Sequence, residues 1–445
     1  MATLMALAPG RRSFVAKENV GGQVTIRKDV RAMSDQDVVN FRTAIAGMAQ
    51  ISANVAGDSR GYQYLAGLHG NPNYYCQHGT PGFALWHRPY VQAFEQAMQD
   101  IVPGVYLPYW DWTSQTEIPQ IFLDETWTNP SNGATEPNPL LGQPMYGGPV
   151  TTRSPGPLGD IQALAPLVAQ ALLDTNYDSF TPDLENPHNG LHVWVGGDMG
   201  QVDSAAYDPL FFAHHCFVEK VFCQWQDAQP GASEPSDVPP QMLVPWGVTI
   251  DQIWNYKNLG YRYEPYGNVA LSFTGPVKPV PTAANTMDAA ILPRPTLKSG
   301  DTVTYFQLGK VDSDFHRAEI RFEGLTPPKD SFTVRVFVNE PGANATTKTD
   351  GNPHFLGFQA FFGHGQCTGD EGHCDPKPRD IFDVRPKHHY DPIKVRLNVT
   401  RPLRALINAG EKLDNAPVTL VVVDPKGAEL HDSGLHFEGF ALVIS

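Results

Sequence analysis

Three histidines recur at a regular interval in the stretch HGNPNYYCQHGTPGFALWH. His69, His78 and His87 stand nine residues apart, and Cys76 precedes the middle one by two positions. A second group, in ENPHNGLHVWVGG and YDPLFFAHHCF, contains His188, His192, His214 and His215. These seven are the only histidines before residue 275, out of 15 in the chain. Because imidazole is the commonest metal ligand in proteins, the two groups predict a metal centre.

The second group is expected to lie on two helices. His188 and His192 are four residues apart, so in a helix both side chains leave the same face and can meet one ion. Asp208 and Pro209 precede an apolar run and predict the N-cap and first position of another helix, which carries the adjacent histidine pair on its next turn. Three ligands from each group predict two metal ions.

The ligand types narrow the choice of metal. Neither group has a carboxylate in ligand register, whereas non-haem iron favours two histidines with one carboxylate, and magnesium or manganese favours oxygen. Six neutral imidazoles suit copper, because they tolerate Cu(I) and leave each ion an open position. Zinc remains chemically possible, although a zinc pair more usually includes Asp or Glu.

Composition excludes several classes of partner. The formal net charge is −15, which repels polyanions, so we expect neither nucleic acid nor an anionic membrane surface as a partner. No stretch approaches the roughly 18 apolar residues that a membrane span needs. Arg11 and Arg12 resemble the start of a twin-arginine export signal, but no apolar region follows them. We expect a cytoplasmic protein, or one released without a recognisable signal peptide.

The five cysteines are too few for a disulfide scaffold in a chain of 445 residues. Cys367 and Cys374 bracket the loop TGDEGH and form either one local bridge or two free thiols.

The hydrophobic period changes along the chain. Apolar residues repeat at helical spacing over 34–50, with Ser34 as the N-cap, over 88–101, and over 160–173, where Pro166 interrupts the pattern. Residues 276–300 are rich in proline and small residues and predict a linker. Beyond it, alternating runs separated by turns predict an antiparallel β-sandwich. The expected fold is α + β with several domains: a mainly helical domain over 1–275, the linker, and the sandwich over 301–445.

Four stretches together resemble the copper motifs of the type-3 copper proteins, the family of tyrosinases, catechol oxidases, o-aminophenol oxidases and molluscan haemocyanins. They are HGNPNYYCQHGTPGFALWHRPYVQAFE, LPYWDWT, PHNGLHVWVGGDMG and DPLFFAHHCFVEKVFCQWQ. GYRY resembles the paired-tyrosine signature that ends the catalytic domain in this family, and SFTVRVFVNEPGAN and NPHFLGFQAFFGHGQC resemble the haemocyanin C-terminal sandwich. The resemblance covers nearly the whole chain and implies a four-helix-bundle core around two coppers.

The resemblance also implies a ligand set. His69, His78 and His87 would bind the first copper, and His188, His192 and His215 the second, while His214 packs or hydrogen-bonds nearby. Cys76 matches the cysteine that some members join to the histidine ring, here His78, through a thioether. The alternative for Cys76 is a buried free thiol.

Further roles follow from the same resemblance. Glu185 and Asn189 stand where members with monophenolase activity hold a water that takes the phenol proton, although helix N-terminal charge compensation also explains Glu185. Phe211 matches an aromatic residue beside the dicopper pocket. Glu219 replaces the usual Asp, and we expect it to keep the same partner. Cys216 and Cys223 are expected to pack in the core.

The implied activity is O2-dependent oxidation of phenols, o-diphenols or o-aminophenols to quinones or quinone imines, with monophenolase activity and homo-oligomer formation left open. The alternative is a haemocyanin-like O2 carrier without turnover; a zinc hydrolase or a structural module is a third class. Phe355, Leu356 and Phe358 are candidates to plug the pocket from the C-terminal domain. The eight later histidines are expected to be structural: His316, His354, His364, His373, His388, His389, His431 and His436.

Overall fold

The computed structural model describes residues 24–264, 287–288, 305–307, 315–365, 388, 390–430 and 433–445. Most of the predicted linker lies outside these residues, and so do Cys367 and Cys374. Within the described ranges, no helix has the length and apolar character needed to cross a bilayer.

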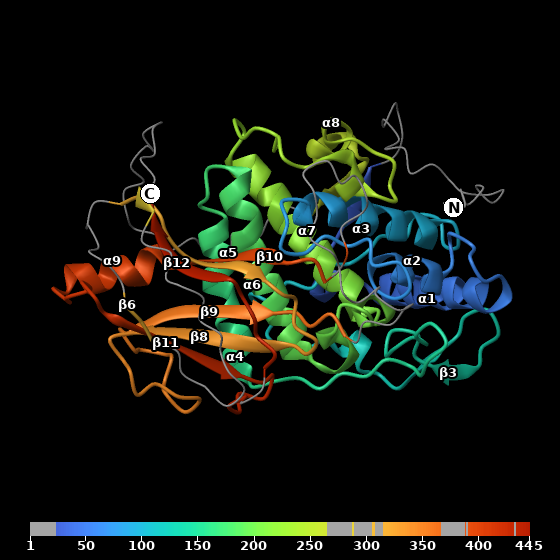
Figure 1. The fold of residues 1–445 in the computed structure, drawn as a ribbon. Helices are drawn as coiled ribbons and strands as arrows, with labels where there is room; N and C mark the ends of the chain where they lie inside the picture. Colours follow the sequence, from blue (N-terminus) through green and yellow to red (C-terminus); the bar gives the residue numbers. More distant parts are fainter. Residues whose placement is uncertain are drawn as a thin grey trace, which may run out of the picture.

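Residues 24–264 form the helical part of the protein (Figure 1). Its helices are α1 (Asp35–Asn54), α2 (Tyr62–His69), α3 (Phe83–Gln99), α4 (Leu158–Gln162), α5 (Leu164–Ala171), α6 (Tyr177–Val195), α7 (Leu210–Ala228) and α8 (Ile250–Trp254). Two small sheets accompany them: β1 (Thr25–Arg27) pairs with β4 (Tyr261–Tyr263), and β2 (Thr126–Thr128) pairs with β3 (Thr135–Pro137).

The helix boundaries follow local chemistry. Ser34 caps α1 as predicted, because its hydroxyl accepts the N–H of Asp37 and the Asp37 carboxylate accepts the N–H of Ser34. The predicted break at Pro166 is wrong: the helices divide at Ala163, and Pro166 lies in the first turn of α5, where a missing N–H costs no hydrogen bond. Pro209 is the N-cap of α7, one position later than predicted.

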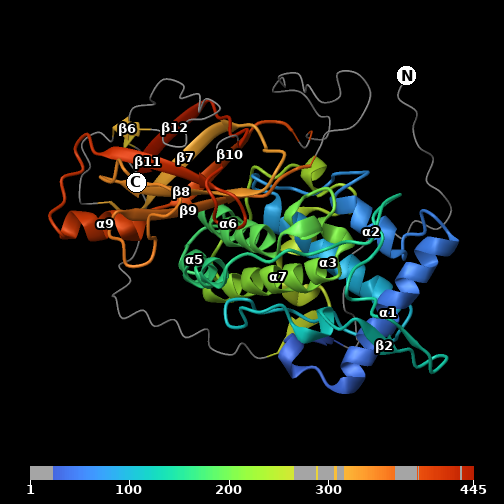
Figure 2. The ribbon, with the colours of Figure 1, turned by 90° about the horizontal axis from the view of Figure 1, so that it is seen from below.

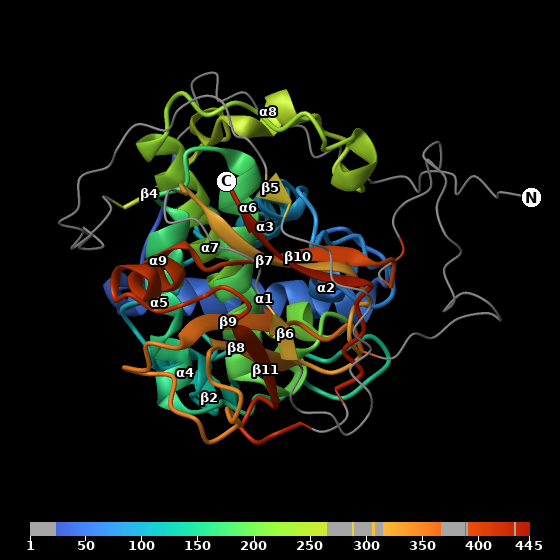
Figure 3. The ribbon, with the colours of Figure 1, turned by 60° about the vertical axis from the view of Figure 1, so that its left-hand side comes forward.

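The remaining described residues form the β part, an antiparallel sandwich as predicted (Figure 3). One sheet has the order β10-β7-β12-β5 and the other β6-β11-β8-β9. The strands are β5 (Met287–Asp288), β6 (Tyr305–Gln307), β7 (Ala318–Leu325), β8 (Phe332–Val338), β9 (Phe355–Phe361), β10 (Ile393–Asn398), β11 (Pro417–Val423) and β12 (Gly439–Ile444). A helix that was not predicted, α9 (Thr400–Asn408), follows β10 directly.

The two parts have separate cores and meet where α6 faces β9 and β10 (Figure 2). β9 is an edge strand, and an asparagine of α6 satisfies its free edge. Asn186 Nδ2 donates to the carbonyl of Phe358 at 2.9 Å, and Asn186 Oδ1 accepts the N–H of Ala360 at 2.9 Å. This pairing fixes where the end of β9 lies relative to the histidines of α6.

Candidate metal centre

Four helices and one loop bring the seven predicted histidines together. His69 ends α2, His78 lies in the loop before α3, and His87 is in α3. α6 carries His188 and His192, and α7 carries His214 and His215. Within each group, one ligand atom from every histidine lies within 4.8 Å of the others. The sequence groups are therefore also spatial groups.

The two groups face each other across a short gap. The ring centroids of His87 and His215 are 4.6 Å apart, and those of His78 and His188 are 5.7 Å apart. Two ions held by these groups would therefore be neighbours, as a binuclear centre requires.

Burial keeps these imidazoles neutral. The pKa values of His87 and His192 fall from 6.5 to about 3, mainly because burial penalises the charged form. Burial likewise lowers the pKa well below its ordinary value for His69, His78, His188, His214 and His215. Neutral imidazoles have the free lone pair that a metal needs.

Backbone carbonyls orient three of the rings. Nδ1 of His69 lies 3.2 Å from the Val202 carbonyl, Nδ1 of His87 lies 2.8 Å from that of Phe83, and Nδ1 of His192 lies 2.8 Å from that of Met199. A carbonyl can only accept, so each Nδ1 carries the proton and each Nε2 presents its lone pair inward.

The second group converges on one point. Nε2 of His215 is 3.1 Å from Nε2 of His188 and 3.4 Å from Nε2 of His192. Nδ1 of His188 lies 2.9 Å from Oδ1 of Asn189, so this Nδ1 is the donor and its Nε2 is free of a proton. Nδ1 of His215 has no hydrogen-bond partner among the described residues, so its Nε2 is free to present a lone pair to the same point. Three imidazole nitrogens at these separations can surround one metal ion.

His214 differs from its neighbour His215. Trp112 Nε1 donates to His214 Nδ1 at 3.0 Å, so the neutral ring must carry its proton on Nε2. His214 therefore has no free lone pair to offer.

Among the residues that the structure describes, His78 has no orienting partner. Both of its ring nitrogens are buried without a hydrogen bond, unlike those of the carbonyl-bound histidines. Cys76, two residues before it, is half-buried, and burial raises the pKa of its thiol. The ring lacks the hydrogen bond that usually holds a metal-binding histidine.

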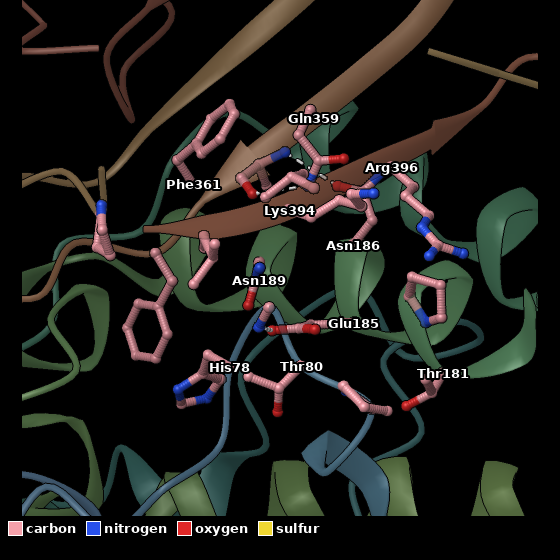
Figure 4. Close-up of a pocket in the computed structure, with 18 of the residues that line it drawn as sticks. His78, Thr80, Thr181, Glu185, Asn186, Asn189, Gln359, Phe361, Lys394 and Arg396 are labelled. Atoms are coloured by element: carbon pink, nitrogen blue, oxygen red, sulfur yellow. Dashed lines mark hydrogen bonds between the residues drawn. The ribbon is translucent and has the colours of Figure 1, made fainter. Parts of the chain in front are cut away.

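Three further predicted site residues lie beside the centre. The Phe211 ring is stacked on His215 at a centroid distance of 4.0 Å. Glu185 and Asn189 line the same cavity as His78 (Figure 4). Glu185 Oε1 accepts the N–H of Gly79 at 2.6 Å, so it also anchors the loop that carries His78.

Glu219 connects α3, α7 and β4 below the metal centre. Its carboxylate accepts hydrogen bonds from Arg88 at 2.9 Å, from Tyr261 at 2.7 Å and from the hydroxyl of Tyr263. Arg88 follows His87 directly, and Glu219 lies one turn after His215. The longer acid thus ties together the backbones that carry one histidine of each group. Cys216 and Cys223 are fully buried, in agreement with the expected packing role.

The β part closes the centre with Phe362. Its ring stacks on His192 at 4.1 Å and lies 5.6 Å from that of His78. The three residues named from the sequence are elsewhere: Phe355 packs on Phe337, Leu356 belongs to the sandwich core, and Phe358 packs on the helical core. The apolar stretch from which these three candidates were chosen ends at Phe362, so the sequence did point to the right segment but not to the right residue.

His364 also lies nearer the centre than expected. Its ring centroid is 6.5 Å from that of His78, it is 7% exposed, and it lines the same cavity. His364 was expected to be structural, and the structure adds that it lies beside the candidate metal centre.

Comparison with known proteins agrees with this geometry. Residues 59–228 match the family model described as the common central domain of tyrosinase. Hemocyanin 2 of Megathura crenulata is 34% identical over 228 residues, covering 49% of this chain and 7% of that protein. Hemocyanin beta-C chain unit G of Helix pomatia is 34% identical over 227 residues, covering 46% of this chain and 52% of that protein. The chain thus spans at most about half of these two relatives.

Solved structures share the fold over nearly the whole chain. A functional unit of octopus hemocyanin superimposes with a TM-score of 0.60 at 20% identity, covering 94% of this chain and 99% of the other. The tyrosinase of Burkholderia thailandensis gives 0.57 at 18% identity, with 91% and 96% covered. A latent aurone synthase, a polyphenol oxidase, gives 0.62 at 17% identity, with 95% and 89% covered. Residues 59–228 thus match the tyrosinase central domain and carry the two facing histidine groups, and the chain shares its fold with these hemocyanin and polyphenol oxidase structures.

Proposed function

We propose that this protein is an oxidase that uses two copper ions and O2 to convert phenols, o-diphenols or o-aminophenols to quinones or quinone imines. The observation that carries the proposal is a cavity of about 360 Å³ next to His78, lined by Glu185 and Asn189. A reversible O2 carrier needs no space for an aromatic ring, whereas ligand pockets of enzymes commonly begin at about 300 Å³.

The proposed ligands are six histidines. His69, His78 and His87 hold one copper, and His188, His192 and His215 hold the other. His214 is left out because its Nε2 carries the proton. When bound, the copper pair supplies electron transfer between O2 and the substrate; two o-diphenols and one O2 give two quinones and two waters.

Cys76 is proposed to form a thioether with His78. This bond would hold the ring in place of the hydrogen bond that His78 lacks. It would also consume the free thiol beside the metal centre. The bond would form with loss of two hydrogens, which O2, the oxidant of the proposed reaction, would accept. Because both residues lie in one tryptic peptide, a mass two hydrogens lower for that peptide, read by mass spectrometry, tests it.

Glu185 and Asn189 are proposed to manage the substrate proton. A water between them could take the hydroxyl proton of a phenol, since one bridging water satisfies the reach that a general base needs. Phe211 would hold His215 in place and bound the apolar side of the site. Failure of monophenols to react, with o-diphenols oxidised normally, would contradict this role.

Phe362 favours a closed resting form. Its ring covers His192, so a substrate reaches the centre only after this side chain moves. The closed site also supports the second candidate function, the haemocyanin-like O2 carrier, because O2 needs less room than a phenol. Turnover of catechol, o-aminophenol and tyrosine, measured before and after limited proteolysis, separates the two. Oxidation that begins or rises after cleavage supports a latent oxidase, whereas reversible O2 binding without turnover in both samples supports the carrier.

A further inference from the structure

The cavity beside the metal centre is built by both parts of the protein. Figure 4 shows His78, Thr80 and the α6 side chains of Glu185 and Asn189 on one side, and Lys394 and Arg396 of β10 on the other. Two basic residues of the β part therefore line the same cavity as His78, and the guanidinium of Arg396 lies on the side of Thr181.

Arg396 is the basic residue with unused hydrogen-bond donors. Its side chain is half-buried, and it makes no hydrogen bond or ion pair with any residue that the structure describes. Its cross-strand neighbour is Arg321, which uses the nearby carboxylate of Glu319 at 2.9 Å. Lys394, in contrast, is paired with Glu323 at 3.0 Å. A guanidinium has five donors, and leaving them without acceptors in a half-buried site is unfavourable.

The cavity also holds acidic groups, and they do not satisfy Arg396. Glu185 already accepts the N–H of Gly79. Burial, and then the charge of Asp237, raises the pKa of Asp178, whereas the charge of Arg396 lowers it. Arg396 also contributes to lowering the pKa of Glu319, whose two oxygens accept hydrogen bonds from Arg317 and Arg321. The remaining titratable groups of the lining are His78 and His364, on the metal side. The guanidinium is thus open to an anion supplied from outside.

We propose that Arg396 binds a carboxylate of the substrate. The preferred substrates are then o-diphenols or o-aminophenols with a carboxylate on the side of the ring opposite the reacting groups. The reacting hydroxyl or amine lies toward His78 and Asn189, and the carboxylate lies against β10. Arginine is well suited to this role because its planar fork donates two parallel hydrogen bonds to a carboxylate.

This inference rests on the proposed oxidase function and gives the β part a second role. Besides covering the centre through Phe362, it contributes a substrate-positioning residue. Removing the β part would therefore increase access and at the same time abolish the preference for anionic substrates.

The test compares three diphenols that differ in charge. The copper-loaded full chain with Phe362→Ala, which opens the centre, is assayed with 3-(3,4-dihydroxyphenyl)propionate, 4-methylcatechol and dopamine. We expect the anion to have the highest kcat/KM. Arg396→Gln should lower the ratio of kcat/KM for the anion to that for 4-methylcatechol by about tenfold, mainly through KM, as for a lost charge-assisted hydrogen bond. Arg321→Gln is the matched control and should leave the ratio unchanged.

Two results would overturn the assignment: an unchanged ratio in Arg396→Gln, or a preference for the cation dopamine. If none of the three is oxidised, the oxidase proposal fails independently. Calorimetric binding of benzoate and benzyl alcohol to the same chains then decides the role of Arg396. Benzoate must bind more tightly than the alcohol, and Arg396→Gln must remove the difference; equal binding refutes the role. Thermal unfolding of each variant shows that it is folded.

Discussion

Arg317 ties the β part to the helical part, and its replacement by glutamine gives the sharpest test of how the centre is kept closed. The residue lies just before β7. Its guanidinium donates to Asp174 at 2.8 Å and to Asp183 at 2.7 Å, both in the helical part, and to Glu319 of its own part at 2.6 Å. Glutamine removes the positive charge of Arg317 and keeps a polar, unbranched side chain.

The expected cost follows from burial. The side chains of Arg317, Asp174 and Asp183 are only 16%, 11% and 4% exposed. Because burial and Asp183 raise the pKa of Asp174, the cost comes from the Arg317–Asp183 ion pair. Removing one partner of a buried ion pair costs about 3–5 kcal/mol, because the remaining charge stays buried without compensation. Asn398 still donates to Asp183 at 2.7 Å, so the lower end applies. About 3 kcal/mol corresponds to a decrease on the order of 100-fold in the equilibrium constant for the closed contact.

The weaker contact between the two parts should be visible both in amide hydrogen exchange and in the rate of diphenol oxidation. In Arg317→Gln, we expect faster exchange of the amides in β9 and in the facing turn of α6, and a higher rate of diphenol oxidation by the uncleaved chain. Arg321→Gln is the matched control, since Arg321 bonds Glu319 within the β part at 2.9 Å. Equal exchange and equal activity in the two variants would refute the role of Arg317 in holding the two parts together.

Three further predictions concern the closure and the support of the metal centre. Phe362→Ala should raise the oxidation rate of the full chain at least tenfold, because it removes the ring stacked on His192; an unchanged rate, measured by quinone absorbance, would place the barrier to access elsewhere. Glu219→Gln should lower the free energy of unfolding by about 3 kcal/mol, because it leaves Arg88 without a buried counter-charge, and chemical denaturation that shows less than about 1 kcal/mol would contradict this. The pKa of Asp174 is raised, first by burial and then by Asp183, so the closed contact holds a proton that the open form releases. Closure is therefore strongest below the ordinary Asp value and weakens as pH rises through the raised pKa. The protection factors of the β9 amides, which correct for the intrinsic rise of exchange with pH, should fall with pH in the wild type and stay constant in Asp174→Asn.

The histidine ligand groups were predictable because their signals are local or strongly patterned. His188 and His192 share a helix face by spacing alone, and the seven histidines of the helical part all gather at one place. The change from helical to alternating period likewise predicted the helical part and the sandwich. These features depend on the spacing of residues along the chain, which can be read from a single sequence.

Contacts between distant segments were not predictable in the same way. Which aromatic residue of the stretch ending in Phe362 meets His192 depends on the register of β9 against α6, which Asn186 sets. The approach of His364 to His78 depends on other long-range contacts, since the N–H of Val202 donates to the Gly363 carbonyl at 2.7 Å and the N–H of His364 donates to the Pro328 carbonyl at 2.9 Å. The helix break was placed at Pro166 because proline interrupts helices, but proline is tolerated in the first turn of a helix. The break is therefore at Ala163, and Pro166 lies in the first turn of α5.

Metal counting combined with spectroscopy tests whether two sets of three histidines hold two coppers. The loaded wild-type chain should contain two coppers, one for each histidine group, and develop a near-ultraviolet charge-transfer band when hydrogen peroxide is added. His87→Gln and His192→Gln should each retain one copper and lose the band, whereas His214→Gln should keep both. A wild-type chain that binds a single ion, or two zinc ions in preference to copper with no such band, would contradict the account.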